Sequence, residues 1–161
     1  MNTEFRKKFL MIMGEAYKAY GFPQITGWIK AVLYLENREL GQVEISEKIT
    51  EILSNEDAPT SVPSVNRALK IMEGYRAIVK SGTRKKGYTY KINPFKNIPL
   101  GLFRRFSTIN KNTIKNLNNL RVDLNQTEDK GLTDAIEKEI ESNQSLLNLI
   151  EKILHLDNQK S

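Results

Sequence analysis

Apolar residues recur at helical spacing along the first third of the chain. Residues 1–20 and the stretch from Pro23 to about Glu36 each carry apolar side chains three and four positions apart, which predicts two amphipathic helices. After a break at residues 37–41, residues 42–45 alternate like a short piece of β-strand. Ser46 is a good N-cap, so we expect a third helix of about two turns to begin there.

The middle of the chain passes from helical spacing to alternation. A polar turn, Asn55–Thr60, leads into a predicted helix from Ser61 to about Gly74, and Ser61 is the expected N-cap. Residues 77–81 and 88–92 then alternate between apolar and polar positions, which predicts two strands. The segment Gly82–Gly87 connects them, so we expect a hairpin with a basic tip.

Heptad spacing dominates the last third of the chain. Apolar positions from Leu102 to Leu124 and from Thr133 to Leu154 predict two long helices, joined around Lys130 and Gly131. Pro99 is expected to delay the start of the first of these helices. The second helix has an apolar stripe wider than one neighbour can cover, so we expect these helices to form a dimer interface.

Composition limits the chemistry that the chain can perform. The sequence has no Cys and a single His, which excludes disulfides, thiol catalysis and zinc sites of the Cys/His type. No apolar run approaches the about 18 residues of a membrane-spanning helix, and the N-terminal apolar patch is too short for a signal peptide, so we expect a cytoplasmic protein. No phosphate-binding glycine loop, activated nucleophile or catalytic carboxylate pair is recognisable, so we expect no enzymatic activity and no cofactor.

Positive charge is concentrated in one segment. Residues 61–96 contain nine Lys and Arg against a single acid, Glu73, although the net charge of the whole chain is only +6. The remainder of the sequence is therefore close to neutral or acidic. Such one-sided clustering is typical of a surface that binds a polyanion.

The order of the predicted elements is that of a winged helix-turn-helix. The fold class we expect is mainly α with a small β-hairpin wing, in which a DNA-binding domain precedes long C-terminal dimerisation helices. The predicted boundaries are residues 1–22 for an N-terminal dimerisation helix, 23–96 for the winged helix-turn-helix and 97–161 for the C-terminal helical region. The helix at about 61–74 would enter the major groove, and the wing at 82–87 would reach the backbone or the minor groove.

Candidate DNA-binding residues lie on the predicted recognition helix and in the hairpin. With the apolar side facing the core, Ser64, Asn66 and Arg67 are expected to point outward, where arginine can read guanine and asparagine can read adenine. Hydroxyl and ammonium groups beside them suit phosphates. The full set of candidates is Thr60, Ser61, Ser64, Asn66, Arg67, Lys70, Lys80, Arg84, Lys85 and Lys86.

Several segments together resemble the GbsR branch of the MarR-type transcriptional regulators. They are GFPQITGWIKAVLYL, ISEKITEIL, SVNRALKIMEGYRAIVKSG and the wing GTRKKGYTYKI, and the resemblance covers roughly residues 5–95. It implies a homodimer in which N-terminal and C-terminal helices interlock. It also implies that Ser64, Asn66 and Arg67 lie in the DNA-reading part, with Arg84, Lys85 and Lys86 at the wing tip. Several members of the family respond to small ligands, which makes a small-molecule effector a candidate partner.

Two hypotheses for the function differ in the sequence specificity of DNA binding. In the first, the chain is a homodimeric regulator that reads a pseudo-palindromic site in double-stranded DNA. In the alternative, the winged helix is an architectural or protein-interaction module with little sequence preference. A group of aromatic residues between Tyr17 and Tyr34 also has two readings, core packing or a cage for a cationic effector.

Overall fold

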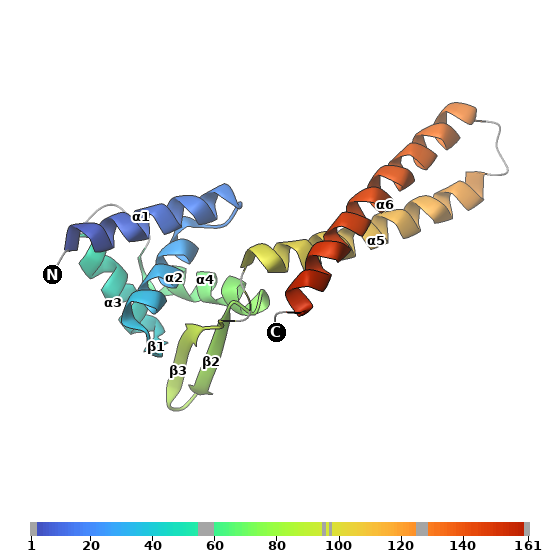
Figure 1. Ribbon diagram of the computed structural model, residues 1–161. Coiled ribbons are helices and arrows are strands. Elements are labelled where there is room, and N and C mark those ends of the chain that lie inside the picture. Colours follow the sequence, from blue (N-terminus) through green and yellow to red (C-terminus); the bar gives the residue numbers. More distant parts are fainter. Residues whose placement is uncertain (1–2, 55–59, 95, 97, 125–128, 160–161) are drawn as a thin grey trace. The chain divides into compact units, whose positions relative to one another are not determined.

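The computed structural model describes residues 3–54, 60–94, 96, 98–124 and 129–159, and the chain divides into two units, Met1–Ile98 and Pro99–Ser161 (Figure 1). The mainly helical fold with a hairpin wing and two long C-terminal helices confirms the predicted class. The turn predicted at 55–60 lies largely outside the described residues. The elements, in chain order, are α1 (Thr3–Ala19), α2 (Gln24–Glu36), β1 (Leu40–Gly41), α3 (Gln42–Leu53), α4 (Val62–Gly74), β2 (Ile78–Thr83), β3 (Gly87–Ile92), α5 (Ile98–Leu124) and α6 (Lys130–Asn158).

Helix α2 is the central element of the first unit. It contacts α1, α3, α4 and β3, and most of its side chains are buried. Its crossing with α1 is unusually close because two glycines lie at the contact. A Cβ atom on Gly27 would lie 2.1 Å from the carbonyl oxygen of Met13, and one on Gly14 would lie 2.3 Å from Nε1 of Trp28. Neither position leaves room for a side chain.

Helix α3 begins earlier than the sequence predicted. Residues 42–45 are its first turn rather than a strand, and the N-cap position is Gly41 rather than Ser46. The strand is confined to Leu40 and Gly41, because these two residues pair with Tyr90 and Thr89 of β3. The alternation at 42–45 is thus the start of a helix whose buried face begins at Ile45.

The sheet has three antiparallel strands in the order β1-β3-β2. Ile78 pairs with Ile92 and Lys80 with Tyr90, and the aromatic ring of Tyr90 is buried in the core. Asn93 fixes the base of the hairpin, because its backbone N–H donates to the carbonyl of Ala77 at 3.0 Å and its side-chain amide donates to the carbonyl of Arg76 at 3.0 Å.

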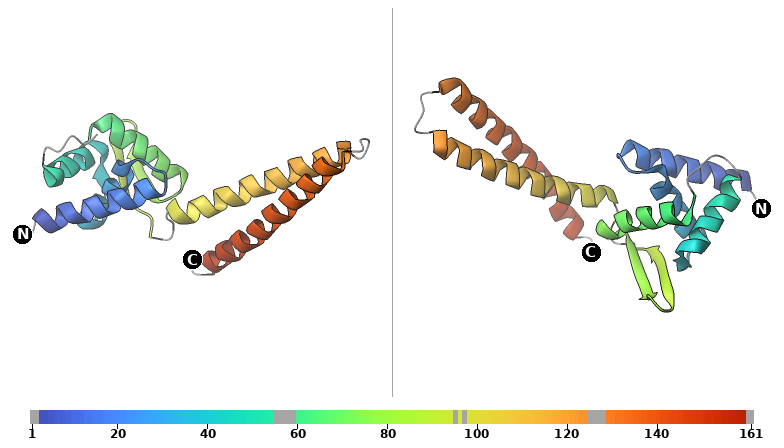
Figure 2. Two further views of the ribbon diagram at one scale, coloured as in Figure 1. Left: turned by 90° about the horizontal axis from the view of Figure 1, so that it is seen from above. Right: turned by 180° about the vertical axis from the view of Figure 1, so that it is seen from behind.

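The second unit is a hairpin of two long helices, which Figure 2 shows side by side from two directions. Helix α5 begins at Ile98, earlier than predicted, and Pro99 does not delay it. Pro99 lies in the first turn, where a missing N–H breaks no helical hydrogen bond. Helix α6 begins at Lys130, earlier than predicted, because the side chain of Asp129 accepts a hydrogen bond from the N–H of Leu132.

Opposite charges face each other in this helical hairpin. Helix α5 carries five basic residues and one acid, whereas α6 carries six acids and three lysines. Arg104 pairs with Asp157 at 2.8 Å, and Lys111 pairs with Glu151 at 3.2 Å. Ile136, Leu147 and Ile150 of α6 are buried. Apolar contact and charge therefore both favour this pairing of the two helices.

Candidate nucleic-acid interface

Helix α4 separates an apolar face from a polar one. Val65, Ala68, Leu69 and Met72 are buried in the core, as their spacing predicted. Ser61 caps the helix, since its hydroxyl accepts a hydrogen bond from the N–H of Ser64. Of the predicted site residues on this helix, Arg67 and Lys70 are exposed and Asn66 is half-buried.

Ser64 differs from the prediction that it points outward. Its side chain is buried, and its hydroxyl accepts a hydrogen bond from the hydroxyl of Ser61 at 3.0 Å. The guanidinium of Arg67 also donates to this hydroxyl, at 3.2 Å. Ser64 lies next to the buried Val65 and completes the polar cap of the helix, so it holds Arg67 on the surface of α4 rather than forming part of that surface itself.

Helix α3 fixes the segment that leads into α4. The hydroxyl of Ser46 donates to the carbonyl of Thr60, and the hydroxyl of Thr50 donates to that of Thr60 at 3.0 Å. Thr60 was predicted as a phosphate contact, and its hydroxyl already has this internal partner. The spacing of residues did not predict that Ser46 and Thr50 would bind Thr60, because these contacts join residues ten or more positions apart.

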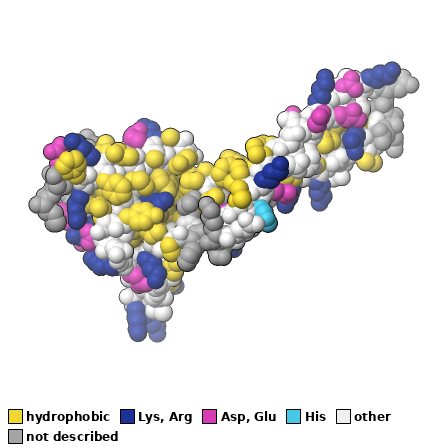
Figure 3. All heavy atoms as spheres, in the orientation of Figure 1, with side chains coloured by type: hydrophobic (Ala, Val, Ile, Leu, Met, Phe, Trp, Pro, Cys, Tyr) yellow, Lys and Arg dark blue, Asp and Glu magenta, His cyan; other side chains and the backbone are white. Residues whose placement is uncertain are grey.

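The turn of the hairpin presents three adjacent cations. Arg84, Lys85 and Lys86 are all exposed, and none forms an ion pair with a residue that the structure describes. The strands extend further than predicted and include Gly82 and Gly87, so the turn itself is only residues 84–86. Figure 3 shows Lys and Arg side chains gathered at this end of the hairpin. Cations held together without neighbouring acids suit a phosphate backbone.

Both glycines of the hairpin are required by its backbone. Gly82 and Gly87 have φ angles of +95° and +86°, a region that L-amino acids with side chains rarely adopt. A Cβ atom on Gly82 would also lie 2.3 Å from the carbonyl oxygen of Gly87. The two glycines therefore set the tight turn that carries the three cations.

Lys80, the remaining predicted site residue, is bound within the protein. Its ammonium lies 3.5 Å from the carboxylate of Glu73 at the end of α4 and 4.1 Å from the ring centroid of Tyr88 on β3. Lys80 thus differs from the three cations of the turn, because it already has an acid and an aromatic face as partners.

Glu39 supports the opposite face of the sheet, and sequence reasoning did not identify it. Its carboxylate accepts hydrogen bonds from the hydroxyl of Thr89 at 2.8 Å and from that of Ser81 at 3.3 Å, and Lys91 lies 3.8 Å away. One acid beside β1 therefore binds both strands of the hairpin. Ser81 and Thr89 are 42 and 50 positions from Glu39 in the sequence, so no local pattern predicts these hydrogen bonds.

Two members of the aromatic group between Tyr17 and Tyr34 contact the ammonium of Lys30. The ammonium of Lys30 donates to the hydroxyl of Tyr17 at 2.9 Å and lies 5.8 Å from the ring centroid of Tyr34. Tyr17 is buried against Tyr20 and Phe22. Burial, together with the nearby Tyr20, raises the pKa of Tyr17 to about 12. Tyr17 and Trp28 are thus part of the core, whereas Tyr20 and Tyr34 are 50% and 52% exposed. Lys30 already supplies a cation to the rings of Tyr17 and Tyr34.

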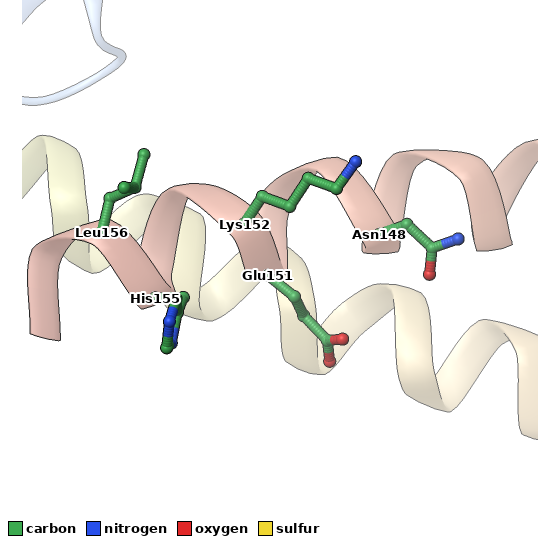
Figure 4. Close-up of a pocket in the computed structure, with 5 residues that line it drawn as sticks. All are labelled: Asn148, Glu151, Lys152, His155 and Leu156. Atoms are coloured by element: carbon green, nitrogen blue, oxygen red, sulfur yellow. The ribbon is translucent and has the colours of Figure 1, made fainter.

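Two hollows on the described part of the chain differ from an ordinary ligand site. One, of about 670 Å³, is lined by residues that include Asn148, Glu151, Lys152, His155 and Leu156 of α6; Lys152 and Leu156 extend from one side of the helix and Glu151 and His155 from the other (Figure 4). Another, of about 280 Å³, lies between the end of α2 and the end of β3. Its cations, Arg38 and Lys91, are paired with acids. Ligand sites ordinarily bring several polar groups to bear on one point.

Among the described residues, no three His, Cys, Asp or Glu side chains are grouped so that they could hold a metal ion. In the same part of the chain, no helix combines the length and the apolar character needed to cross a membrane.

Comparison with known proteins gives a likeness of fold. No family model matches the sequence, and no curated protein matches it significantly. A solved structure described as the crystal structure of a transcriptional regulator matches with a TM-score of 0.67 and 10% sequence identity, over 96% of this chain and 98% of the other. At this identity the match shows a shared fold, which extends over both units of the chain.

Proposed function

We propose that the chain is a transcriptional regulator that binds double-stranded DNA as a homodimer, with α4 in the major groove and the hairpin on the backbone or in the minor groove. The observation that carries this proposal is the pairing of the exposed side of α4 with the cationic turn of residues 84–86 in one unit. A helix fits the major groove, and basic groups beside it fit the phosphates. The solved structure with the same fold is described as a transcriptional regulator, and the GbsR-type resemblance of the sequence agrees with this function.

Arg67 and Lys85 have different roles under this proposal. Arg67 lies on the exposed side of α4, so it can make a bidentate contact with a guanine, whereas Lys85 at the turn meets phosphates that every sequence shares. Arg67→Ala should therefore reduce discrimination by about 1–3 kcal/mol. Lys85→Ala should weaken binding to all duplexes alike and lower the salt slope by about 0.9.

The measurement begins with selection of a tight-binding duplex from a random pool by the purified full chain. Each variant is then titrated with the selected duplex and with a scrambled duplex of the same composition, at several salt concentrations. Equal losses on both duplexes for Arg67→Ala would contradict base reading and favour the architectural alternative. If the random pool yields no enriched duplex and the wild-type chain binds no DNA, the proposed function is wrong.

The dimer in this proposal rests on a second apolar seam of the α5–α6 hairpin. Besides the side chains buried between the two helices, each helix has large apolar residues on another face. The exposed ones include Phe106, Ile109, Leu120, Leu146, Leu149 and Leu156. A second copy can cover this seam as a four-helix bundle, in which the basic α5 of one copy meets the acidic α6 of the other.

Replacement of Leu149 tests that assembly. Leu149 is 57% exposed, so Leu149→Glu should leave the fold of one chain intact but bury a carboxylate in the dimer. Sedimentation equilibrium should show a dimer for the wild-type chain and a dissociation constant raised by about 100-fold or more for the variant. Gln144→Glu, an equal change of charge at another exposed position of α6, should remain dimeric. A wild-type monomer at micromolar concentration would contradict this part of the proposal.

A further inference from the structure

Three elements of the DNA-binding unit meet at one ammonium group. Glu73 is in the last turn of α4, Lys80 is in β2 and Tyr88 is in β3. The Nζ atom of Lys80 lies 3.5 Å from Oε1 of Glu73 and 4.1 Å from the ring centroid of Tyr88. The end of the recognition helix is thus joined to both strands of the hairpin through a single side chain.

The register of the sheet explains why these groups converge. Lys80 is directly opposite Tyr90, and Tyr88 is two positions along the same strand, so all three side chains lie on one face of the sheet. Tyr90 is buried in the core, and Tyr88 is 40% exposed. Lys80 therefore lies where the hairpin leaves the core, at 6.0 Å from the ring centroid of Tyr90 and nearer to that of Tyr88.

A two-stranded hairpin that extends away from a core is marginally stable by itself. Beyond Lys80, the strands continue to Thr83 and Gly87, and the cationic turn follows. An ammonium between a carboxylate and an aromatic face makes an ion pair and a cation–π contact at once. These two contacts tie the projecting part of the hairpin to the last turn of α4.

We propose that Lys80 is a positioning residue, which fixes the cationic turn relative to the recognition helix through Glu73 and Tyr88 and does not itself neutralise a phosphate. The DNA-binding part of this inference rests on the proposed function. That Lys80 fixes the turn relative to α4 concerns the free protein, and it does not depend on DNA binding. It also separates Lys80 from Arg84, Lys85 and Lys86, which have no ion-pair partner among the described residues.

Glu73→Gln distinguishes this role from a direct phosphate contact. If Lys80 positions the hairpin, loss of the carboxylate frees the hairpin and weakens DNA binding. If Lys80 binds a phosphate, loss of the carboxylate releases the ammonium and strengthens binding. Glu47→Gln is the matched control, because it removes an exposed acid of α3 that pairs with no described residue.

The first measurement is amide hydrogen exchange of the free full-length protein at residues 81–88. Glu73→Gln and Lys80→Gln should each speed this exchange about fivefold, Lys80→Arg should restore it because arginine can make both contacts, and Glu47→Gln should leave it unchanged. Unchanged exchange in both Glu73→Gln and Lys80→Gln would overturn the inference. This result does not depend on DNA, so it remains decisive even if the proposed function fails.

The second measurement is the affinity of the same variants for a random-sequence 30-base-pair duplex at several salt concentrations. Glu73→Gln and Lys80→Gln should both lower affinity by about fivefold, and the salt slope should stay that of the wild-type chain, because no phosphate contact is lost. Lys80→Arg should bind as the wild type does. A slope reduced by about 0.9 in Lys80→Gln, together with tighter binding by Glu73→Gln than by Glu47→Gln, would show that Lys80 is a phosphate ligand.

Discussion

Gly27→Ala is expected to destabilise the first unit, Met1–Ile98, by about 3 kcal/mol. The added methyl group would lie 2.1 Å from the carbonyl oxygen of Met13, and the obstructing atoms belong to the backbone of α1. A side chain could rotate away from such a clash, but a helix backbone can only move as a whole. The contact between α1 and α2 must therefore open, and the core around the central helix α2 opens with it.

Unfolding by urea, followed by tryptophan fluorescence, measures this effect directly. Trp28 is the single tryptophan of the chain and is buried in the same contact, so its emission reports on this unit alone. Gly74→Ala is the control, because nothing lies within 4 Å of the added atom at the end of α4. That change should be neutral or stabilise by up to about 1 kcal/mol. Equal midpoints for the two variants would show that the helices do not cross as closely as described.

Replacement of Arg84, Lys85 and Lys86 together by glutamine is expected to lower affinity for any double-stranded DNA on the order of 100-fold. The three cations occupy one short turn and form no ion pair with a described residue, so their charge is available to phosphates. Each phosphate contact that is lost should also reduce the salt slope by about 0.9, and the combined variant by up to about 2.7. The fold should be unaffected, because all three side chains are exposed.

The control for this variant is the triple change of Lys115, Arg121 and Lys130 to glutamine. These residues are also exposed, and their replacement also removes three positive charges, but they lie in the α5–α6 hairpin. Sedimentation equilibrium must show both variants to be dimers, because α5 is proposed to contribute charge to the dimer. Titration of both variants with one fluorescent duplex over a range of salt concentrations gives their DNA affinities. The comparison separates the effect of charge in the turn from the effect of net charge. A similar loss in the two variants would mean that net charge, and not the turn of residues 84–86, attracts the DNA.

Helix α4 could be predicted from the sequence because its signals are local. Val65, Ala68, Leu69 and Met72 follow the helical period, and Ser61 supplies the cap at the expected position. The hairpin was predicted for the same reason, since alternating residues flank a glycine-bounded basic segment. These elements carry their own start and stop signals, and the predicted fold class is correct.

The beginning of α3 was predicted wrongly because a tertiary contact decides it. Leu40 and Gly41 form a strand only because β3 lies beside them, and the helix then begins immediately afterwards. Ser46 is a sound N-cap by local rules, but its hydroxyl bonds to Thr60 on another segment. Local propensity could not show whether the hydroxyl of Ser46 would cap a helix or bind the carbonyl of Thr60.

Some of the candidate residues already have partners within the protein, and residue type alone did not indicate which ones. Ser64 and Lys80 are the type of residue that binds phosphate, and both stand beside residues that remain predicted contacts. In the structure, the hydroxyl of Ser64 is hydrogen-bonded in the cap of α4. The ammonium of Lys80 contacts the carboxylate of Glu73 and the ring of Tyr88. Residue type predicts what a side chain can bind, whereas its neighbours decide what it is free to bind.

Helix α4 carries its buried and its exposed residues at different positions, so its surface can change separately from its core contacts. The side chains that hold the helix in the core, such as Leu69 and Met72, are different from the exposed Arg67 and Lys70. Substitutions on the exposed side should therefore spare the packing of the unit. A combinatorial library at positions 67 and 70 would retain folded members in high proportion. New target preferences could thus arise, in evolution or by selection in the laboratory, without compensating changes in the interior.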